Sequence, residues 1–237
     1  QTLLGPLWYI VQPLIYTLVF TIIFGRLASL STDGIPDVLF YLSGTVIWTF
    51  FATSLTSTGN VFFKYHELFS KVYFPRLVIP ISIIFTNSIQ FFLQFIIFIS
   101  FYFYYIFFQN FEPNFNLKFL FLPIIFLNIL ILSLGVGALI SVLTSKYRDL
   151  GMVLNFLVQI WMFASPVVYP LSALPENYQL LASFNPMTLN VELFREIFFN
   201  SKNLSISFYL SSYFVTFSFL FFGVYLFNKR AKDFIDT

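Results

Sequence analysis

The sequence lacks cysteine altogether and contains one histidine, which excludes several kinds of chemistry. Without cysteine there can be no disulfide, no thiolate metal site and no cysteine nucleophile. No GxxxxGK[ST] loop is present to cradle nucleotide phosphates, so we do not expect this chain to hydrolyse ATP. His66 is predicted to lie on the surface of a short helix rather than in a catalytic site. We therefore expect no catalytic residue, no metal site and no cofactor bound by this chain.

Charged residues are also scarce, at 9% of the 237 residues; an ordinary soluble domain has about 25%. Hydrophobic residues make up 59% of the chain, which is more apolar surface than a soluble fold of this size could bury. The net charge of +2 is too small to indicate binding to nucleic acid. We therefore expect membrane lipid to surround much of the protein.

The few charged residues divide the sequence into six long uncharged runs. A helix needs about 20 apolar residues to cross a hydrocarbon core of about 30 Å, and each run is long enough. No run shows the alternating polarity of a β-barrel strand. The predicted fold is an all-α, polytopic membrane protein with about six transmembrane helices, which form one domain over residues 1–237. The predicted spans are residues 7–26, 38–60, 79–107, 119–143, 152–170 and 206–227.

Basic residues are unevenly divided between the two sides of this predicted bundle. Eight of the 12 lysines and arginines fall on the side that holds the even-numbered loops and the C-terminal tail. Basic residues concentrate in cytoplasmic loops of membrane proteins. We therefore expect both termini to lie in the cytoplasm.

The segment NVFFKYHELFSKVYFPR at residues 60–76 is predicted to form a short amphipathic helix at the cytoplasmic surface. Apolar residues recur at helical spacing along one face, and the opposite face carries Lys64, Glu67 and Lys71. Pro75 then interrupts the helix, just before Arg76. The pattern fits a helix that docks on a partner; a helix that rests on lipid with no partner is the alternative.

The segment at residues 169–205 contains three prolines and too many polar residues for a further span. We predict two short helices, around residues 176–183 and 188–200, which lie on the external face or dip into the membrane from it. Asn185 and Pro186 form the turn between them. An ordinary extracytoplasmic loop is the alternative.

All carboxylates are expected in loops or tails, so the polarity within the spans comes from neutral groups. Amides and hydroxyls could hydrogen-bond between helices or line a path for a hydroxyl-rich substrate. Aromatic rings could pack in the core or stack on sugars. The candidates for a path are Gln12, Trp48, Gln159 and Trp161. Ser133, Gly137 and Ser141 form a stripe of small residues, which we expect to pack within one bundle rather than against a second copy.

Five short strings occur in the order found in one family of transporters. LLGPLWYIVQP at 3–13, VYFPRLVIPIS at 72–82, KYRDL at 146–150, SPVVYP at 165–170 and NPMT at 185–188 resemble the permease subunits of type-2 ABC exporters for O-antigen, teichoic acid and capsular polysaccharide. The resemblance spans nearly the whole chain. It lacks the cytoplasmic segment that precedes LGPLW in the family, and the chain opens at Gln1, so we expect native sequence upstream.

The resemblance implies a homodimer of six-span permeases in the bacterial inner membrane, bound to two copies of a separate ATPase that carries ATP and Mg. The substrate would be a polysaccharide on a lipid carrier. The implied contacts with the ATPase are Lys64, Glu67, Lys71, Arg76, Tyr147, Arg148 and Asp149. The implied extracytoplasmic gate comprises Tyr169, Pro170, Asn185, Pro186, Glu192 and Arg195. A type-2 ABC permease for a drug or lipid, and a channel without an ATPase, are the alternatives.

Overall fold

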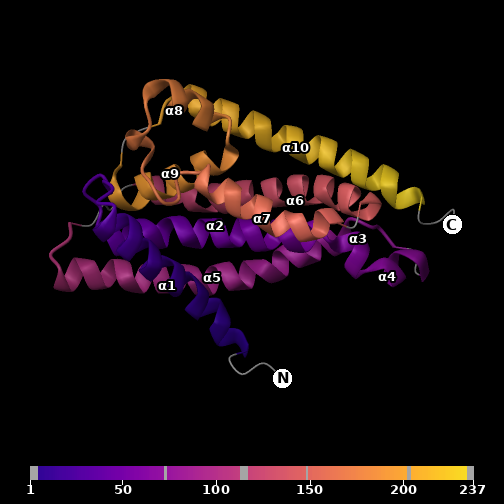
Figure 1. Cartoon of the computed structure of the whole chain (residues 1–237), viewed down its shortest axis with the longest axis horizontal. Helices are drawn as coiled ribbons and strands as arrows, with labels where there is room; N and C mark the ends of the chain where they lie inside the picture. The colour runs from indigo at the N-terminus through magenta and orange to yellow at the C-terminus, as the bar shows by residue number, and fades with distance from the viewer. Residues whose placement is uncertain (1–4, 72–73, 113–116, 148, 202–203, 234–237) are drawn as a thin grey trace.

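The computed structural model describes the chain except residues 1–4, 72–73, 113–116, 148, 202–203 and 234–237. The described residues form helices and no strand, and most of the long helices run along one common axis (Figure 1). Five of them are long and apolar enough to cross a membrane. They are α1 (Trp8–Phe20) with its π-helical continuation η2 (Thr21–Leu27), α2 (Asp37–Gly59), α5 (Val78–Phe108), α6 (Leu122–Lys146) with the preceding turn η3 (Leu117–Phe121), and α10 (Ile206–Asp233). The all-α membrane fold is thus confirmed.

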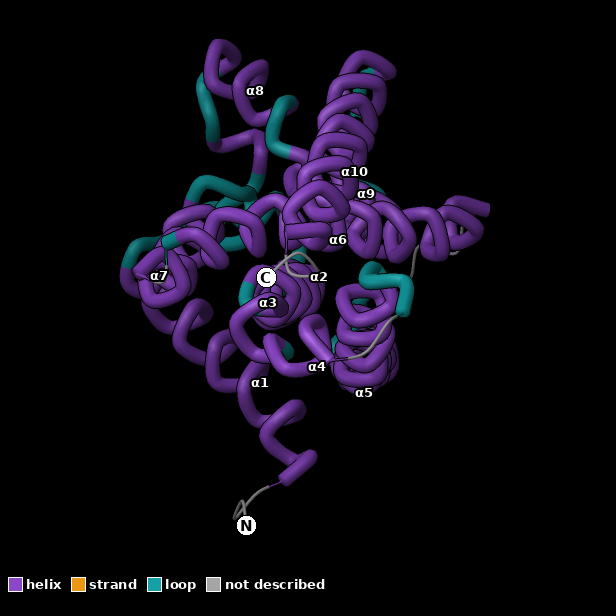
Figure 2. The backbone as a smooth tube through the Cα atoms, turned by 90° about the vertical axis from the view of Figure 1, so that its right-hand side faces the viewer, coloured by secondary structure: helices purple, strands orange, loops and turns teal. Residues whose placement is uncertain are grey.

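Helix α2 lies at the centre of the bundle, as the end-on view in Figure 2 shows. Of its most apolar stretch, 83% is buried, against 17–39% for the other four long helices. It contacts α1, α5 and α6, and also two shorter helices, α7 (Asp149–Phe163) and α9 (Pro186–Phe199). The apolar sides of the outer helices are exposed, as expected of surfaces that face lipid.

Helices α6 and α10 pack closely because both carry glycine where they cross. A Cβ placed at Gly223 would collide with the carbonyl oxygen of Gly135. The small-residue stripe on α6 is buried inside the chain, and a Cβ at Gly137 would lie 2.7 Å from the Thr58 side chain. The stripe therefore serves packing within one bundle, as predicted.

The fifth predicted span, residues 152–170, is wrong beyond Phe163. Helix α7 has 15 residues, which is about 22 Å at 1.5 Å per residue and shorter than a hydrocarbon core of about 30 Å. Pro166 disfavours helical geometry at the residue before it, and residues 164–170 form turns instead. The turns lead into η4 (Leu171–Ala173) and α8 (Glu176–Ser183).

The two short helices predicted after this span are both present, but only α8 lies on the surface. Helix α9 packs inside the bundle against α2, α6 and α10, and most of its residues are buried. The sequence placed this helix and its carboxylates in the connection before the last span, as observed, but it did not indicate that they are buried. Glu192 and Glu196 are on α9, and both belong to ion pairs there.

The amphipathic segment is two short helices rather than one: α3 (Val61–Lys64) and α4 (His66–Lys71). The break falls at Tyr65, whose backbone leaves the helical region. Phe62 stacks on Phe227 of α10 with ring centroids 4.6 Å apart, so α3 is anchored to the bundle. Leu68 belongs to the apolar face predicted for a single helix over residues 60–76, yet it is 44% exposed. The turn at Tyr65 rotates α4 out of register with α3 and explains this difference.

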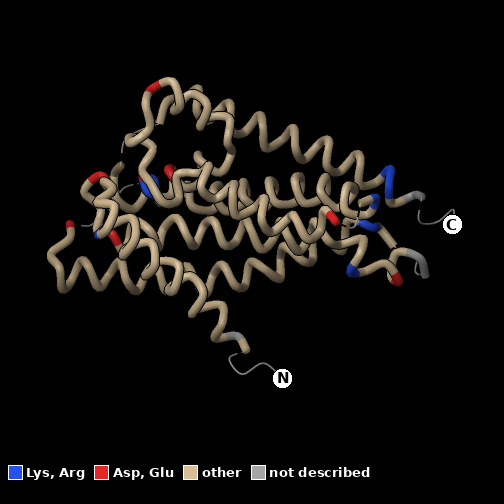
Figure 3. Tube along the Cα trace, in the orientation of Figure 1, with Lys and Arg blue, Asp and Glu red and all other residues tan. Residues whose placement is uncertain are grey.

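Charged residues gather at the two ends of the bundle and leave its middle without charge (Figure 3). We call the end that carries Lys64, Lys146, Lys229 and Arg230 the basic end; it is also where the described part of the chain stops. The opposite end carries Asp33, Asp37, Glu112 and Glu176, and we call it the acidic end. This division follows the uneven distribution of basic residues in the sequence.

Candidate functional site

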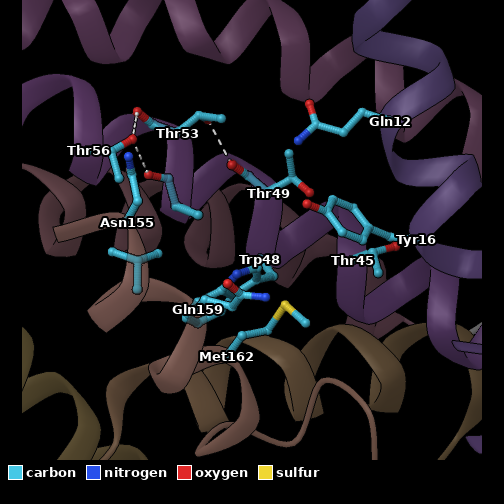
Figure 4. A pocket seen from close by; sticks show the side chains of 12 residues that line it. Gln12, Tyr16, Thr45, Trp48, Thr49, Thr53, Thr56, Asn155, Gln159 and Met162 are labelled. Atoms are coloured by element: carbon cyan, nitrogen blue, oxygen red, sulfur yellow. Dashed lines mark hydrogen bonds between the residues drawn. The ribbon is translucent and has the colours of Figure 1, made fainter. Parts of the chain in front are cut away.

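A cavity of about 300 Å³ opens between α1, α2 and α7, in the uncharged middle of the bundle. Figure 4 shows polar side chains from the three helices pointing toward this shared space. The polar and aromatic residues that line it are Gln12, Tyr16, Thr45, Trp48, Thr49, Thr53, Thr56, Asn155 and Gln159. A polar cavity is costly at membrane depth unless something fills or covers it.

The four threonines follow one side of α2 at intervals of four, four and three residues. Each of Thr45, Thr53 and Thr56 donates its hydroxyl proton to a backbone carbonyl of its own helix. Their oxygens can still accept a hydrogen bond from a ligand. α2 thus offers a column of acceptors along the cavity.

The amides complement these acceptors. Among the described residues, no side-chain hydrogen bond occupies the amides of Gln12, Asn155 or Gln159, and each amide can both donate and accept. Trp48 adds an aromatic surface and is itself 5% exposed, with its ring packed on Phe51. The arrangement suits a ligand with many hydroxyl groups.

Three of the four residues predicted for a path, Gln12, Trp48 and Gln159, lie in this one cavity. Trp161 lies apart from them. Its Nε1 donates to Asn185 Oδ1 at 3.1 Å, and it borders a separate cavity of about 560 Å³ beside α8 and α10. The residues we missed are Tyr16, Thr49, Thr53 and Thr56. The helical spacing of threonine along α2 could have indicated the three threonines.

Arg195 occupies the acidic end of the bundle, and it is the largest fully buried side chain among the described residues. Its Nη1 donates to the Pro166 carbonyl at 2.6 Å and to Glu192 Oε1 at 3.1 Å. Its Nη2 donates to the Val167 carbonyl at 2.9 Å. The guanidinium also lies 3.6 Å from the centroid of the Phe40 ring on α2. One side chain of α9 therefore joins α2 to the connection that follows α7.

Two further residues of α9 and its N-terminal turn hold the same connection. Asn185 caps α9 by accepting from the Met187 N–H, and its amide donates to the Ala164 carbonyl and to Ser165 Oγ. Glu192 accepts a hydrogen bond from the Leu171 backbone. We call residues 164–171 together with Asn185, Glu192 and Arg195 the clasp.

All six predicted gate residues belong to the clasp or border it. Pro170 is buried and precedes η4, and Pro186 is buried at the first turn of α9. Tyr169 is half-buried, and burial raises the pKa of its phenol. The prediction thus selected residues that do lie together, although their role as a gate is a separate question.

The clasp lies close to the acidic end of the polar cavity, although none of its residues lines the cavity. Met162, which lines the cavity, lies near the end of α7, and the connection folds back over α2 directly after it. A Cβ at Gly44, beside the cavity residue Thr45, would lie 2.8 Å from the Val167 carbonyl oxygen and 3.1 Å from Arg195 Nη2. Only glycine allows the connection to approach α2 so closely.

The charges of the clasp depend on one another. Burial raises the pKa of Glu192 above its ordinary value, and the charge of Arg195 opposes that shift. Burial also lowers the pKa of Arg195, but a guanidinium stays protonated in proteins. A second ion pair lies nearby on α9, where Lys118 Nζ and Glu196 Oε1 are 2.8 Å apart. The Glu192–Arg195 pair is internal to α9, whereas the Lys118–Glu196 pair joins α9 to η3.

The residues predicted to contact an ATPase lie at the basic end. Glu67, Tyr147 and Asp149 are exposed, and Tyr147 lies beside Lys146. Arg76 is half-buried at the start of α5. Lys64 lines a small cavity, considered below. Arg148 and the side chain of Lys71 lie outside the described residues.

A bundle of apolar helices around a polar cavity is typical of a membrane transport protein, and comparison with known sequences identifies the class. The chain belongs to the ABC-2 type transporter family, whose family model matches residues 1–199.

The chain is 27% identical over 238 residues to an O-antigen export system permease protein, RfbA, of Klebsiella pneumoniae, covering 100% of this chain and 88% of the relative. RfbA of Myxococcus xanthus is 26% identical over 201 residues, which cover 84% of this chain and 74% of that protein. The polysialic acid transport protein KpsM of Escherichia coli is 27% identical over 238 residues, which cover 97% and 87%.

Proposed function

We propose that this chain is the permease subunit of an ATP-driven exporter that moves a lipid-linked polysaccharide, of the O-antigen, teichoic acid or capsule type, across the bacterial inner membrane. The single observation that carries the proposal is the polar cavity between α1, α2 and α7. Its unpaired amides and threonine oxygens match the hydroxyl groups of a glycan. The names of the similar proteins, which export O-antigen or transport polysialic acid, agree with this substrate class.

Two copies of the chain are proposed to enclose the path. Asn155 and Gln159 are exposed on α7, beside exposed Phe156 and Ile160. Amides that face lipid with no partner are costly, whereas amides that face a second copy or a substrate are not. We infer that this side of α1 and α7 meets its counterpart in a homodimer, with the polar cavities facing one another.

A separate ABC ATPase is proposed to bind the basic end and to carry ATP and Mg. Membership of an ABC family, together with the lack of a phosphate-binding loop in this sequence, supports that division of labour. Its contacts would be exposed Glu67 on α4, exposed Tyr147 before α7 and exposed Asp149 at the start of α7. Both termini would then lie in the cytoplasm, and residues 1–237 would act as one transmembrane domain.

The clasp is proposed to act as the extracytoplasmic gate. It lies where α7 ends, so a shift of α7 relative to α2 would pull directly on residues 164–171. Movement of the ATPase at the basic end could reach the acidic end through α7, which begins at Asp149 and lines the cavity. This is a mechanical hypothesis, and it requires that α7 move as one body.

The test is an export assay in a bacterial host that lacks its own polysaccharide permease and expresses this chain with the ATPase of the same genome. The double variant Asn155→Leu/Gln159→Leu removes two amides from the cavity. With each hydrogen bond worth about 0.5–1.5 kcal/mol, export should fall at least about fivefold. Ser100→Leu, at an exposed position on α5 outside the cavity, is the control and should export normally. Normal export by the double variant would contradict the proposed path, and export of a drug or lipid but no polysaccharide by the unaltered pair would contradict the substrate class.

A further inference from the structure

A second polar cavity, of about 210 Å³, lies at the basic end between the last turn of α2, α3 and α5. It is lined by Ser57, Lys64, Tyr65, Ser82, Thr86 and Asn87, together with Ile83. Lys64 is the one charged residue in this lining, and no carboxylate belongs to it. The cavity is separate from the path between α1, α2 and α7. Its electrostatic character favours an anion.

The lining supplies more donors than the protein uses. The hydroxyls of Ser82 and Thr86 donate to backbone carbonyls of α5 at 2.8 and 2.9 Å. The amide of Asn87 makes one long contact, 3.4 Å, to Ser54. The ammonium of Lys64 lies 5.6 Å from the centroid of the Tyr65 ring, and among the described residues it belongs to no ion pair within 4 Å. The Lys64 ammonium and the Asn87 amide can therefore both donate to a bound oxygen.

The position of the cavity indicates that its ligand is part of a lipid. Ser82 and Thr86 are exposed on α5, within a surface that is otherwise apolar. Ile81, Phe85 and Ile89 on the same helix are 38%, 62% and 64% exposed, as expected of residues in contact with hydrocarbon. The cavity thus opens where the apolar surface of the bundle meets its basic end. That is the depth at which lipid headgroups lie.

We propose that this cavity binds the phosphate of a lipid headgroup, with Lys64 and Asn87 as its donors and the hydrocarbon chain of the lipid lying along the exposed side of α5. The phosphate could belong to an anionic phospholipid or to a polyprenyl pyrophosphate carrier, since the contacts would be the same. Lys64 would then bind lipid rather than an ATPase. The site itself does not depend on the proposed transport function; only its assignment to a polyprenyl carrier does.

The test uses the full chain, purified and placed in phosphatidylcholine nanodiscs, with no ATPase present. Native mass spectrometry measures binding of dioleoyl phosphatidylglycerol to the wild type, Lys64→Gln, Lys64→Arg and Lys229→Gln. Lys229 is the matched control, because it is an exposed lysine at the basic end that does not line the cavity. Loss of one charge-assisted hydrogen bond should weaken binding at least about tenfold in Lys64→Gln. Lys64→Arg should keep most of the affinity, and Lys229→Gln should bind as the wild type does.

A second arm identifies the source of the phosphate. Displacement of phosphatidylglycerol by undecaprenyl pyrophosphate would support the site and assign it to a polyprenyl carrier, whereas binding without displacement would support it as a phospholipid site. Equal binding by Lys64→Gln and the wild type would overturn the proposal, as would an equal loss in Lys229→Gln. The proposal would also be overturned if Lys64→Gln lost the ATPase in a pull-down but bound lipid normally. That result would show that Lys64 contacts the ATPase instead. Because lipid binding is measured without transport, the binding result can be interpreted even if the export proposal fails.

Discussion

Replacing Arg195 tests whether the clasp holds the acidic end of the bundle together. Arg195→Met keeps much of the volume and removes the guanidinium. The carbonyls of Pro166 and Val167 then lose donors at 2.6 and 2.9 Å, and Glu192 loses a partner at 3.1 Å. The Arg195 side chain is 1% exposed, so solvent cannot replace these contacts. Breaking a buried ion pair in this way costs about 3–5 kcal/mol, and we expect the free energy of unfolding to fall by that amount.

Glu192→Gln provides the matched second variant. It removes the carboxylate charge but leaves an amide oxygen that can still accept from Arg195, so we expect a smaller loss of about 1–3 kcal/mol. In the double variant Glu192→Gln/Arg195→Met, no charge is left buried without a partner. Its loss should therefore be less than the sum of the two single losses, by about 0.5–3 kcal/mol.

The measurement is unfolding of the full chain in mixed micelles by titration with sodium dodecyl sulfate, followed by tryptophan fluorescence. Additive losses, within about 0.5 kcal/mol, would show that the two side chains do not interact energetically. A loss below about 1 kcal/mol for Arg195→Met, the value typical of a surface ion pair, would refute the clasp as a structural element.

Two further predictions follow from the packing and from the charge distribution. Gly223→Ala should lower the free energy of unfolding by about 3 kcal/mol, because the added Cβ collides with the backbone of Gly135. This value is in the upper part of the range for overpacking. Ser218→Ala on the same helix is the control, and equal stability of the two variants would contradict the close crossing. Because the chain has no cysteine, a single introduced cysteine is the only thiol that a labelling reagent can modify. Ser31→Cys in intact cells should react with an impermeant maleimide, whereas Tyr147→Cys should react only after permeabilisation. The reverse labelling would place the basic end outside the cell.

The long helices could be predicted because an uncharged run of about 20 residues has few alternatives to a membrane span. The predicted bounds of α2 and α5 differ from the observed ones by one residue at each end. The end of α7 could not be predicted in the same way. Ser165 to Val168 continue the apolar run, and it is Pro166 and the contacts of Arg195 that turn the backbone away from the helix.

The burial of α9 depends on partners that are distant in the sequence. Glu196 pairs with Lys118, 78 residues earlier in the chain, and Arg195 binds carbonyls that precede it by 28 and 29 residues. Before those partners are known, charges at these positions indicate a surface helix. The sequence also did not show which tryptophan lines the path, because Trp48 and Trp161 lie in similar sequence surroundings. Only the packing of α7 against α2 shows that they point into different cavities.

The clasp holds the connection after α7 through main-chain atoms. Arg195 binds the carbonyl oxygens of Pro166 and Val167, which are present whatever side chains those positions carry. Gly44 is different, because any added side chain there meets the Val167 carbonyl and the guanidinium. The positions of the clasp should therefore differ in how well they tolerate substitution. Position 167 can change in sequence while the fold of the connection persists, and position 166 is restricted only by the turn that its proline favours. Gly44 and Arg195, in contrast, must be kept or change together.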